Sequence, residues 1–150
     1  MHEPQLPDNP DFEALLESSR KTIEFRIEKP DMDAFARLSG DFNPLHTKDE
    51  FARTQGFSGR VVYGGLLVAQ ISRMIGMHLP GKNAIWSKLD VQFISPLFVD
   101  EEASLTAEIM TKSEAAQTLI LKIRIERADK LIARGNAMVQ YRSGNSPQAT

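Results

Sequence analysis

The sequence has 150 residues, the usual size of one domain, and its 41% hydrophobic and 25% charged residues are typical of a soluble globular protein. A formal net charge of −2 without a basic stripe argues against a nucleic-acid partner. The absence of cysteine excludes disulfides, thiolate chemistry and zinc–cysteine sites, and the three histidines show no metal-ligand spacing. We therefore expect no metal site.

The start of the chain predicts neither a signal peptide nor a membrane segment. Residues 1–12 contain three prolines among acidic and amide side chains, where a signal peptide needs a basic start and an apolar run. No run approaches the roughly 20 apolar residues of a membrane span. We expect a cytoplasmic protein without a membrane partner, with flexible segments at residues 1–12 and 143–150.

The first ordered elements expected are a short helix, a strand and a second helix. A short helix is predicted to begin at Phe12. Residues 20–28 alternate between apolar and polar side chains, which predicts a half-buried strand. Pro30 ends this strand, and Asp31 is expected to cap the helix that follows.

Asp41 and His46 flank a turn in the next segment. Asn43-Pro44 lies between them and is a strong turn signal, so the chain is predicted to fold back and to point both side chains into one space. A carboxylate and an imidazole facing one apolar, partly dry cavity suit proton transfer. The alternative is structural, with Asp41 as a cap and His46 as a satisfied core residue.

Two further helices are predicted after this turn. Thr47-x-x-Glu50 is a capping-box pattern, which predicts a short helix over residues 49–54. The longest apolar stretch of the chain, residues 66–79, has apolar side chains around most of a helical circumference. Such a helix is expected to be buried on most sides.

Four segments of alternating apolar and polar residues follow this helix. They lie in residues 89–93, 103–109, 119–125 and 131–141, and a period of two predicts strands. A buried helix and an antiparallel sheet with one apolar face give an α+β layer in which the sheet curls around the helix. No internal repeat or linker is visible, so residues 1–150 are assigned to a single domain.

One ordered pattern runs through the segment that contains the turn. It consists of Phe35, Ser39, Gly40, Asp41, Asn43, Pro44, Leu45, His46 and Ala52. This pattern resembles that of the MaoC-like hydratase family, and specifically the (R)-specific enoyl-CoA hydratases, also called hydratase 2. The similarity extends over roughly residues 20–142. It implies the hot-dog fold, in which a curled antiparallel sheet wraps around a long central helix.

The resemblance implies catalytic roles for Asp41 and His46. It also implies that the backbone N–H of Gly64, before the long helix, is an oxyanion-hole donor, and that Ser72 lines the site. The dipole and free N–H groups of a helix N-terminus favour a developing negative charge, and glycine lets an oxygen approach the backbone. The alternative is that Gly64 only relieves a tight entry into the helix.

Two more residues are candidates beside the expected thioester pocket. Asn43 is expected to fix the turn or to orient Asp41, and a plain turn residue is the alternative. Tyr63 stands where many members of the family have His, and residues 60–62 stand where many have Pro. Tyr63 is therefore a candidate for supporting the site or lining the substrate.

The activity implied by the resemblance is that of a hydro-lyase. Water would add syn to a trans-2-enoyl-CoA and give a (3R)-hydroxyacyl-CoA, in fatty acid or polyhydroxyalkanoate-type metabolism. Asp41 and His46 would share one water, and the sequence leaves open which is the base and which the acid. No cofactor is expected, because coenzyme A is part of the substrate. A homodimer is expected, because hot-dog relatives pair their open sheet edges.

Other functions remain open from the sequence. A (3R)-hydroxyacyl-ACP dehydratase would use the same residues in the reverse direction. A hot-dog acyl-CoA thioesterase would attack the thioester carbonyl instead, and a non-catalytic acyl-thioester-binding module would not need both Asp41 and His46. A short-to-medium acyl chain is expected if Phe42, Tyr63 and Met74 close the floor of the pocket.

Overall fold

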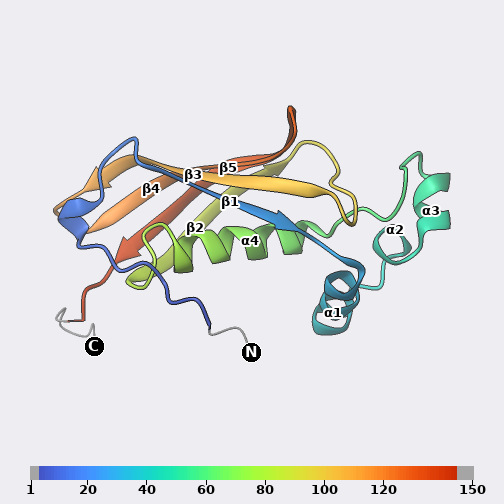
Figure 1. Cartoon of the computed structure of the whole chain (residues 1–150), viewed down its shortest axis with the longest axis horizontal. Helices are drawn as coiled ribbons and strands as arrows, with labels where there is room; N and C mark the ends of the chain where they lie inside the picture. Colours follow the sequence, from blue (N-terminus) through green and yellow to red (C-terminus); the bar gives the residue numbers. More distant parts are fainter. Residues whose placement is uncertain (1–3, 145–150) are drawn as a thin grey trace.

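The computed structural model describes residues 4–144, in which one long helix lies against a single five-stranded sheet (Figure 1). All neighbouring strands are antiparallel, in the order β1-β3-β4-β5-β2. The strands are β1 (Arg20–Arg26), β2 (Ala84–Phe93), β3 (Glu102–Ser113), β4 (Thr118–Arg127) and β5 (Lys130–Tyr141). The helices are the 3₁₀ turn η1 (Phe12–Ala14), α1 (Lys29–Ser39), α2 (Pro44–Thr47), α3 (Asp49–Thr54) and α4 (Gly64–Met77).

The core lies between α4 and one face of the sheet. Alternate residues of β3 and β4 are fully buried, as the period of two predicts, among them Leu105, Ile109 and Leu121. Helix α4 contributes Leu67, Ile71, Met74 and Ile75, whose spacing of three and four residues places them on one helix face. The α+β arrangement predicted from the sequence is therefore confirmed.

The predicted burial of α4 on most sides is wrong for the single chain. The sheet covers one side of the helix, and Gly65, Ala69, Ser72, Arg73 and Gly76 are exposed on the other. Of the apolar residues that led to the prediction, Leu66, Val68 and Met77 are only partly buried and Ala69 is exposed. Among residues 4–144, no helix combines the length and apolar character needed to cross a membrane.

Helices α1, α2 and α3 extend past the end of the sheet, and we call residues 29–54 the overhang (Figure 1). Helix α1 begins with a capping box of Glu28 and Asp31, in which the Glu28 N–H donates to Asp31 Oδ2 at 2.8 Å. Asp31 thus acts as the third helical residue and not as the cap. The predicted Thr47 cap is also wrong, because the Thr47 hydroxyl donates to Asn43 O at 3.3 Å.

Part of the segment expected to be a flexible arm is bonded to the domain. The Asp8 N–H donates to Met77 O at 2.8 Å, and Asp8 O accepts from the Lys82 N–H at 2.8 Å. The Tyr141 hydroxyl donates to Pro10 O at 2.8 Å. The flexibility expected for residues 1–3 and 145–150 concerns positions outside the described part of the chain.

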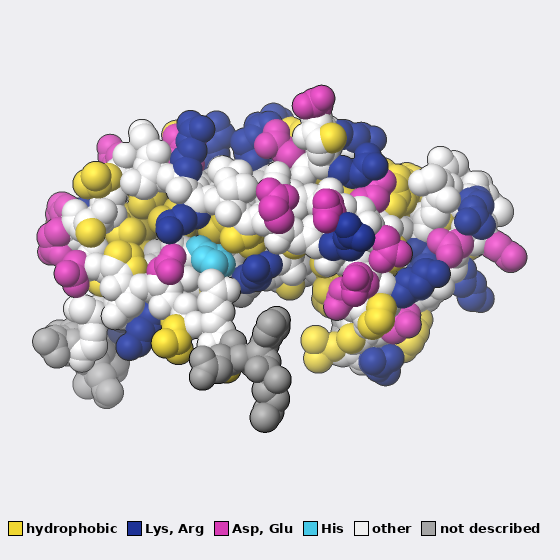
Figure 2. Space-filling view, viewed as in Figure 1, with side chains coloured by type: hydrophobic (Ala, Val, Ile, Leu, Met, Phe, Trp, Pro, Cys, Tyr) yellow, Lys and Arg dark blue, Asp and Glu magenta, His cyan; other side chains and the backbone are white. Residues whose placement is uncertain are grey.

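Charged side chains of both signs are interspersed over the face seen in Figure 2. This distribution agrees with the small net charge of −2. Lysine and arginine lie beside aspartate and glutamate over the sheet and over the overhang in this view. Two ion pairs join β1 to β3: Arg26 with Glu102 at 2.8 Å and Arg20 with Glu108 at 3.1 Å.

Candidate active site

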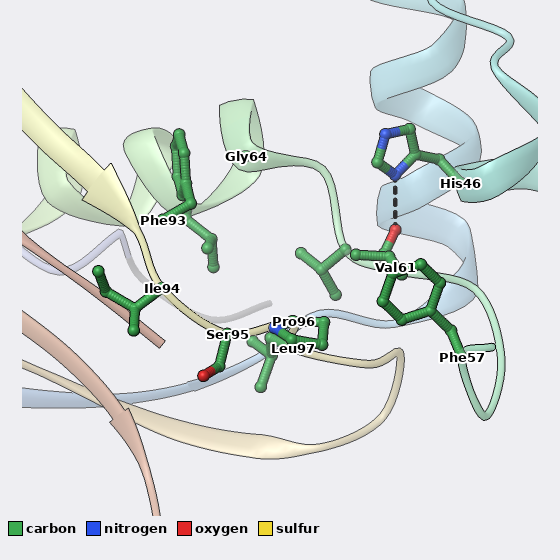
Figure 3. Close-up of a pocket in the computed structure, with 11 residues that line it drawn as sticks. His46, Phe57, Val61, Gly64, Phe93, Ile94, Ser95, Pro96 and Leu97 are labelled. Carbon is green, nitrogen blue, oxygen red and sulfur yellow. Dashed lines mark hydrogen bonds between the residues drawn. The ribbon is translucent and has the colours of Figure 1, made fainter. Parts of the chain in front are cut away.

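A cavity of about 450 Å³ lies where the start of α4 meets the end of β2 and the overhang (Figure 3). Most of its wall is apolar, and one imidazole and one hydroxyl are the polar side chains in it. Its lining residues are His46, Phe57, Val61, Val62, Gly64, Leu67, Phe93, Ile94, Ser95, Pro96 and Leu97. An apolar cavity of this size with a few convergent polar groups is typical of a small-molecule site.

His46 enters this cavity from α2. Asn43 caps that helix by accepting the Leu45 N–H at 2.9 Å, and Pro44 follows as the first helical residue, so the turn predicted from Asn43-Pro44 is a helix start. His46 Nδ1 lies 2.7 Å from Val61 O (Figure 3). Because a carbonyl oxygen only accepts, Nδ1 carries the proton and the Nε2 of the neutral ring keeps its lone pair. This tautomer gives His46 the form of a general base.

Tyr63 connects His46 to Asp41. The Tyr63 ring stacks on the imidazole with 4.1 Å between centroids, and its hydroxyl donates to the main-chain oxygen of Asp41 at 2.6 Å. Phe35 packs on the same ring at 4.7 Å. Tyr63 is 2% exposed and does not line the cavity, and its contacts are with His46, Phe35 and the Asp41 backbone.

The environment of Tyr63 keeps its hydroxyl protonated. Burial raises the pKa of Tyr63 above its ordinary value of 10.0, and the Asp41 carboxylate raises it further. The Arg60 guanidinium lowers the pKa of Tyr63, but this effect is smaller than the other two. The phenol is therefore a stable hydrogen-bond donor at neutral pH.

The carboxylate of Asp41 is exposed and does not line the cavity in the single chain. Its Oδ1 accepts the Asn43 N–H at 3.0 Å, and the Asp41 N–H in turn donates to Ser39 Oγ at 3.1 Å. The structure thus brings the Asp41 backbone next to the Tyr63 ring that stacks on His46. Asn43 does what was expected of a turn residue, and it also binds Asp41 through its N–H.

Gly64 lies at the wall of the cavity as the first residue of α4, with Tyr63 as the N-cap. The first N–H groups of a helix have no partner inside the helix, so the Gly64 N–H suits an anion. A Cβ added at Gly64 would lie 2.9 Å from Cζ of Phe93. Ser72 lies two turns further along α4, where it is exposed and does not line this cavity.

The residues expected to close the floor of the pocket do not line this cavity. Phe42 is 63% exposed, Met74 is fully buried in the core, and neither lines the cavity. Residues 93–97, which carry no motif of their own, form this part of the wall. This segment lies beside the start of α4 because the Val62 N–H donates to Leu97 O at 2.8 Å. No local pattern signals this non-local pairing.

Comparison with known proteins identifies the family. The family described as "MaoC like domain" matches residues 11–128. The (R)-specific enoyl-CoA hydratase of Aeromonas caviae is 33% identical over 129 residues, which cover 85% of this chain and 96% of that protein. The (R)-specific enoyl-CoA hydratase of Rhodospirillum rubrum is 27% identical over 128 residues, which cover 85% of this chain and 89% of that protein. The chain belongs to the MaoC-like family.

The solved structures give the same result for the fold. The structure of the (R)-hydratase from A. caviae involved in PHA biosynthesis superposes with a TM-score of 0.83 at 32% identity, over 86% of this chain and 98% of that chain. The predicted hot-dog fold and the resemblance to the MaoC-like hydratases are therefore confirmed.

Proposed function

We propose that this protein is an (R)-specific enoyl-CoA hydratase, a hydro-lyase that adds water to a trans-2-enoyl-CoA and forms a (3R)-hydroxyacyl-CoA. The observation that carries the proposal is the geometry of His46. Its Nδ1 is fixed by Val61 O at 2.7 Å, and the ring lies in the wall of an apolar cavity that Gly64 also lines. A base and an anion-binding helix start therefore border one space.

The residues support a reaction in which one water supplies both added groups. His46 Nε2 removes a proton from water while the water oxygen forms a bond to C3 of the substrate. The electron pair of the C2–C3 double bond moves to the thioester oxygen, where the Gly64 N–H stabilises the charge. The proton taken up by His46 is then delivered to C2, directly or through Asp41, while the electron pair returns from the oxygen and the thioester carbonyl re-forms. Addition from one face is syn, and the reaction requires no cofactor besides the coenzyme A of the substrate.

Asp41 is proposed as the second member of the catalytic pair. Its Oδ1 already binds the Asn43 N–H, so Oδ2 is the oxygen that would hold the water or deliver the proton to C2. The two groups would exchange protons with the same water, so their protonation is coupled.

We further propose a cytoplasmic homodimer. Strand β2 is an edge of the sheet, and Ile85, Phe93 and the following Ile94 are 45%, 54% and 49% exposed. An open edge with exposed apolar side chains favours pairing with a second copy. Because Phe93 and Ile94 also line the cavity, such pairing would cover its mouth. Sedimentation velocity at micromolar concentration tests this proposal, and a monomer would contradict it.

A dehydratase acting on acyl-carrier protein is the second candidate. A mitochondrial 3-hydroxyacyl-[acyl-carrier-protein] dehydratase of Arabidopsis thaliana is 34% identical over 103 residues, which cover 69% of this chain and 60% of that protein. The same residues would serve the reverse reaction. Comparing the turnover of one acyl group on coenzyme A and on acyl-carrier protein separates the two carriers.

The decisive experiment follows the enoyl-thioester absorbance band with crotonyl-CoA as substrate. We expect the absorbance to fall without release of free thiol, and chiral analysis to give the (3R)-hydroxy product. Release of thiol would indicate a thioesterase. An unchanged band with measurable binding would indicate a non-catalytic acyl-thioester-binding module, and the hydratase proposal would then be wrong.

A further inference from the structure

Arg60 is buried beside the site although it carries a charge. Its side chain is 9% exposed, and within residues 4–144 it is the one charged residue that is buried. It lies in the segment between α3 and α4, directly before Val61, whose carbonyl binds His46. It does not line the cavity that contains His46. A buried charge is costly unless it is paired and hydrogen-bonded, so its partners indicate what it does.

The partners of Arg60 come from all three helices of the overhang. Nε donates to the main-chain oxygen of His46 in α2 at 2.7 Å. Nη2 donates to Asp33 Oδ1 in α1 at 3.2 Å. The Arg60 backbone N–H donates to Asp49 Oδ1 in α3 at 2.9 Å. The Asp49 carboxylate packs closely against Gly59, the residue before Arg60. A Cβ added at Gly59 would lie 3.0 Å from Asp49 Oδ1.

His46 is therefore held at two points by two consecutive residues. Arg60 Nε binds the main-chain oxygen of His46, and Val61 O binds its imidazole, both at 2.7 Å. The Val61 N–H also donates to Leu45 O at 3.2 Å. One bond fixes where α2 lies and the other fixes the orientation and tautomer of the ring. If the Arg60 bond is lost, α2 is a four-residue helix without a buried residue, and it keeps only its two bonds to Val61 and the stacking of His46 on Tyr63.

We propose that Arg60 is a positioning residue for His46, which it fixes by binding α2 to α1 and α3. This inference rests on the proposed hydratase function. Arginine suits the task because its planar guanidinium presents several donors in a fixed fork, whereas a lysine ammonium is a single point charge on a flexible stem. The Nε and Nη2 groups of one guanidinium can reach the His46 main chain and the Asp33 carboxylate together.

If Arg60 forms only a structural ion pair, a different result is expected. Replacing a buried ion pair by apolar residues of similar size is often neutral for stability, and here the carboxylate left behind, Asp33, is 58% exposed to water. A structural role therefore predicts that Arg60→Met changes neither the turnover nor the state of His46 in the folded protein. A positioning role predicts that the fold persists while kcat falls, because methionine fills the space of the apolar stem but donates no hydrogen bond.

The first readout is the split between kcat and KM with crotonyl-CoA. We expect Arg60→Met to lower kcat by about 10²-fold, the loss that a displacement of about 1 Å in a reacting group can cause. KM should stay within about 2-fold, because Arg60 does not contact the cavity and the lost interaction affects only the reacting geometry. Arg60→Lys should restore little of the turnover. Arg53→Met is the matched control, because Arg53 is an exposed arginine of α3 in the same overhang.

The second readout does not depend on activity. Nitrogen NMR of the imidazoles, with His46 assigned by comparison with His46→Gln, should show one Nδ1-protonated tautomer in the native protein. In Arg60→Met this signal should broaden or shift toward a mixture of tautomers, whereas Arg53→Met should leave it unchanged. The pH profile of kcat should change in Arg60→Met alone.

The inference fails if folded Arg60→Met has native kcat and native His46 signals. If Arg60→Met does not fold, Asp33→Ala replaces it, since Asp33 is 58% exposed and its removal frees one side of the guanidinium. That variant should lose several-fold in kcat at constant KM and broaden the His46 signal, and unchanged values would overturn the inference. If the native protein shows no hydratase activity, the proposed function fails, and the imidazole signals still decide the positioning role.

Discussion

Tyr63 donates its hydroxyl proton to the main-chain oxygen of Asp41 at 2.6 Å. The same ring stacks on His46 with 4.1 Å between centroids, so one buried side chain contacts both residues of the proposed catalytic pair. The position of Asp41 relative to His46 therefore depends on a residue that does not line the cavity itself.

The Tyr63→Phe variant separates the two contacts of this ring. Phenylalanine keeps the stacking on His46 and removes the bond to Asp41. We expect kcat to fall by roughly 3- to 10-fold, which corresponds to about 1 kcal/mol in the activation barrier. The free energy of unfolding should fall by about 0.5–1.5 kcal/mol, the net value of one hydrogen bond. Urea unfolding and turnover of crotonyl-CoA measure both. A native kcat would show that this bond does not position Asp41.

Because the pKa of Tyr63 is raised, the free energy of unfolding should depend on pH in the alkaline range. Burial and the Asp41 carboxylate raise the pKa in the folded state above the unfolded value of 10.0. The folded state thus holds the phenol proton more tightly than the unfolded state does. The stability that depends on this proton is fully present below about pH 10 and is lost as the pH rises through the folded pKa. The difference in unfolding free energy between the native protein and Tyr63→Phe should therefore shrink above pH 10. A difference that stays constant between pH 8 and pH 11 would contradict this.

The catalytic pair itself is tested by Asp41→Asn, His46→Gln and the double variant. Each single change should lower kcat by roughly 10²–10⁴-fold, the range for general acid–base catalysis, with little change in substrate binding. The double variant should be scarcely worse than either single one, because groups that act as a unit are not additive. A cap without a catalytic role would instead cost about 1 kcal/mol of stability and leave turnover intact. Thermal midpoints measured beside kcat distinguish the two outcomes for each residue.

Gly64→Ala and Gly65→Ala form a matched pair at the start of α4. A Cβ at Gly64 would meet the outer end of the Phe93 ring, and Phe93 is 54% exposed in the single chain, so stability should change little. Turnover should fall, because the methyl group and the displaced ring crowd the N–H proposed to bind the thioester oxygen. A Cβ at Gly65 would meet the Phe35 ring, which packs on Tyr63 at 4.7 Å.

Gly65→Ala should therefore cost stability first, by roughly 1–3 kcal/mol, as overpacking does. Thermal unfolding and kcat of the two variants give the comparison. Equal thermal midpoints would mean that Phe35 adapts as easily as Phe93. Native turnover in Gly64→Ala would remove the support for an oxyanion donor at this position.

Much of the fold could be predicted because its signals are local. The period of two in β3, β4 and β5 follows from one face packing on α4. The structure keeps it except at the start of β5, where Ile132 is buried in place of Leu131 beside a register shift. Strand β2 begins at Ala84, five residues before the predicted start. The alternation of its first residues is interrupted by a register shift between Trp86 and Lys88, so the pattern did not show this part of the strand. The extent of burial of α4 could not be predicted, since composition does not say which sides of a helix are covered.

The site was predictable only in part. The motif around Asn43-Pro44 pointed to Asp41 and His46, because a turn and two chemical groups lie within six residues. The structure places His46 in the wall of the cavity and, in the single chain, the Asp41 carboxylate outside it. The Val61 carbonyl, the 93–97 wall and Arg60 act through pairings between distant segments, and nothing in their own sequence marks them. An isolated arginine is usually a solvated charge, so its burial beside His46 could come only from the structure.

The overhang has few buried anchors: Met32 and Ala36 in α1, Ala52 in α3, and no buried residue in α2. Segments of this kind open locally at lower free energy than a packed sheet, so their amide protons exchange with solvent sooner. On warming, the helices that carry His46 should loosen while β3, β4 and β5 are still intact. A ligand that binds only the closed overhang would raise the free energy of this opening by mass action. The proposed catalytic pair thus belongs to a segment that we expect to open before the packed sheet does.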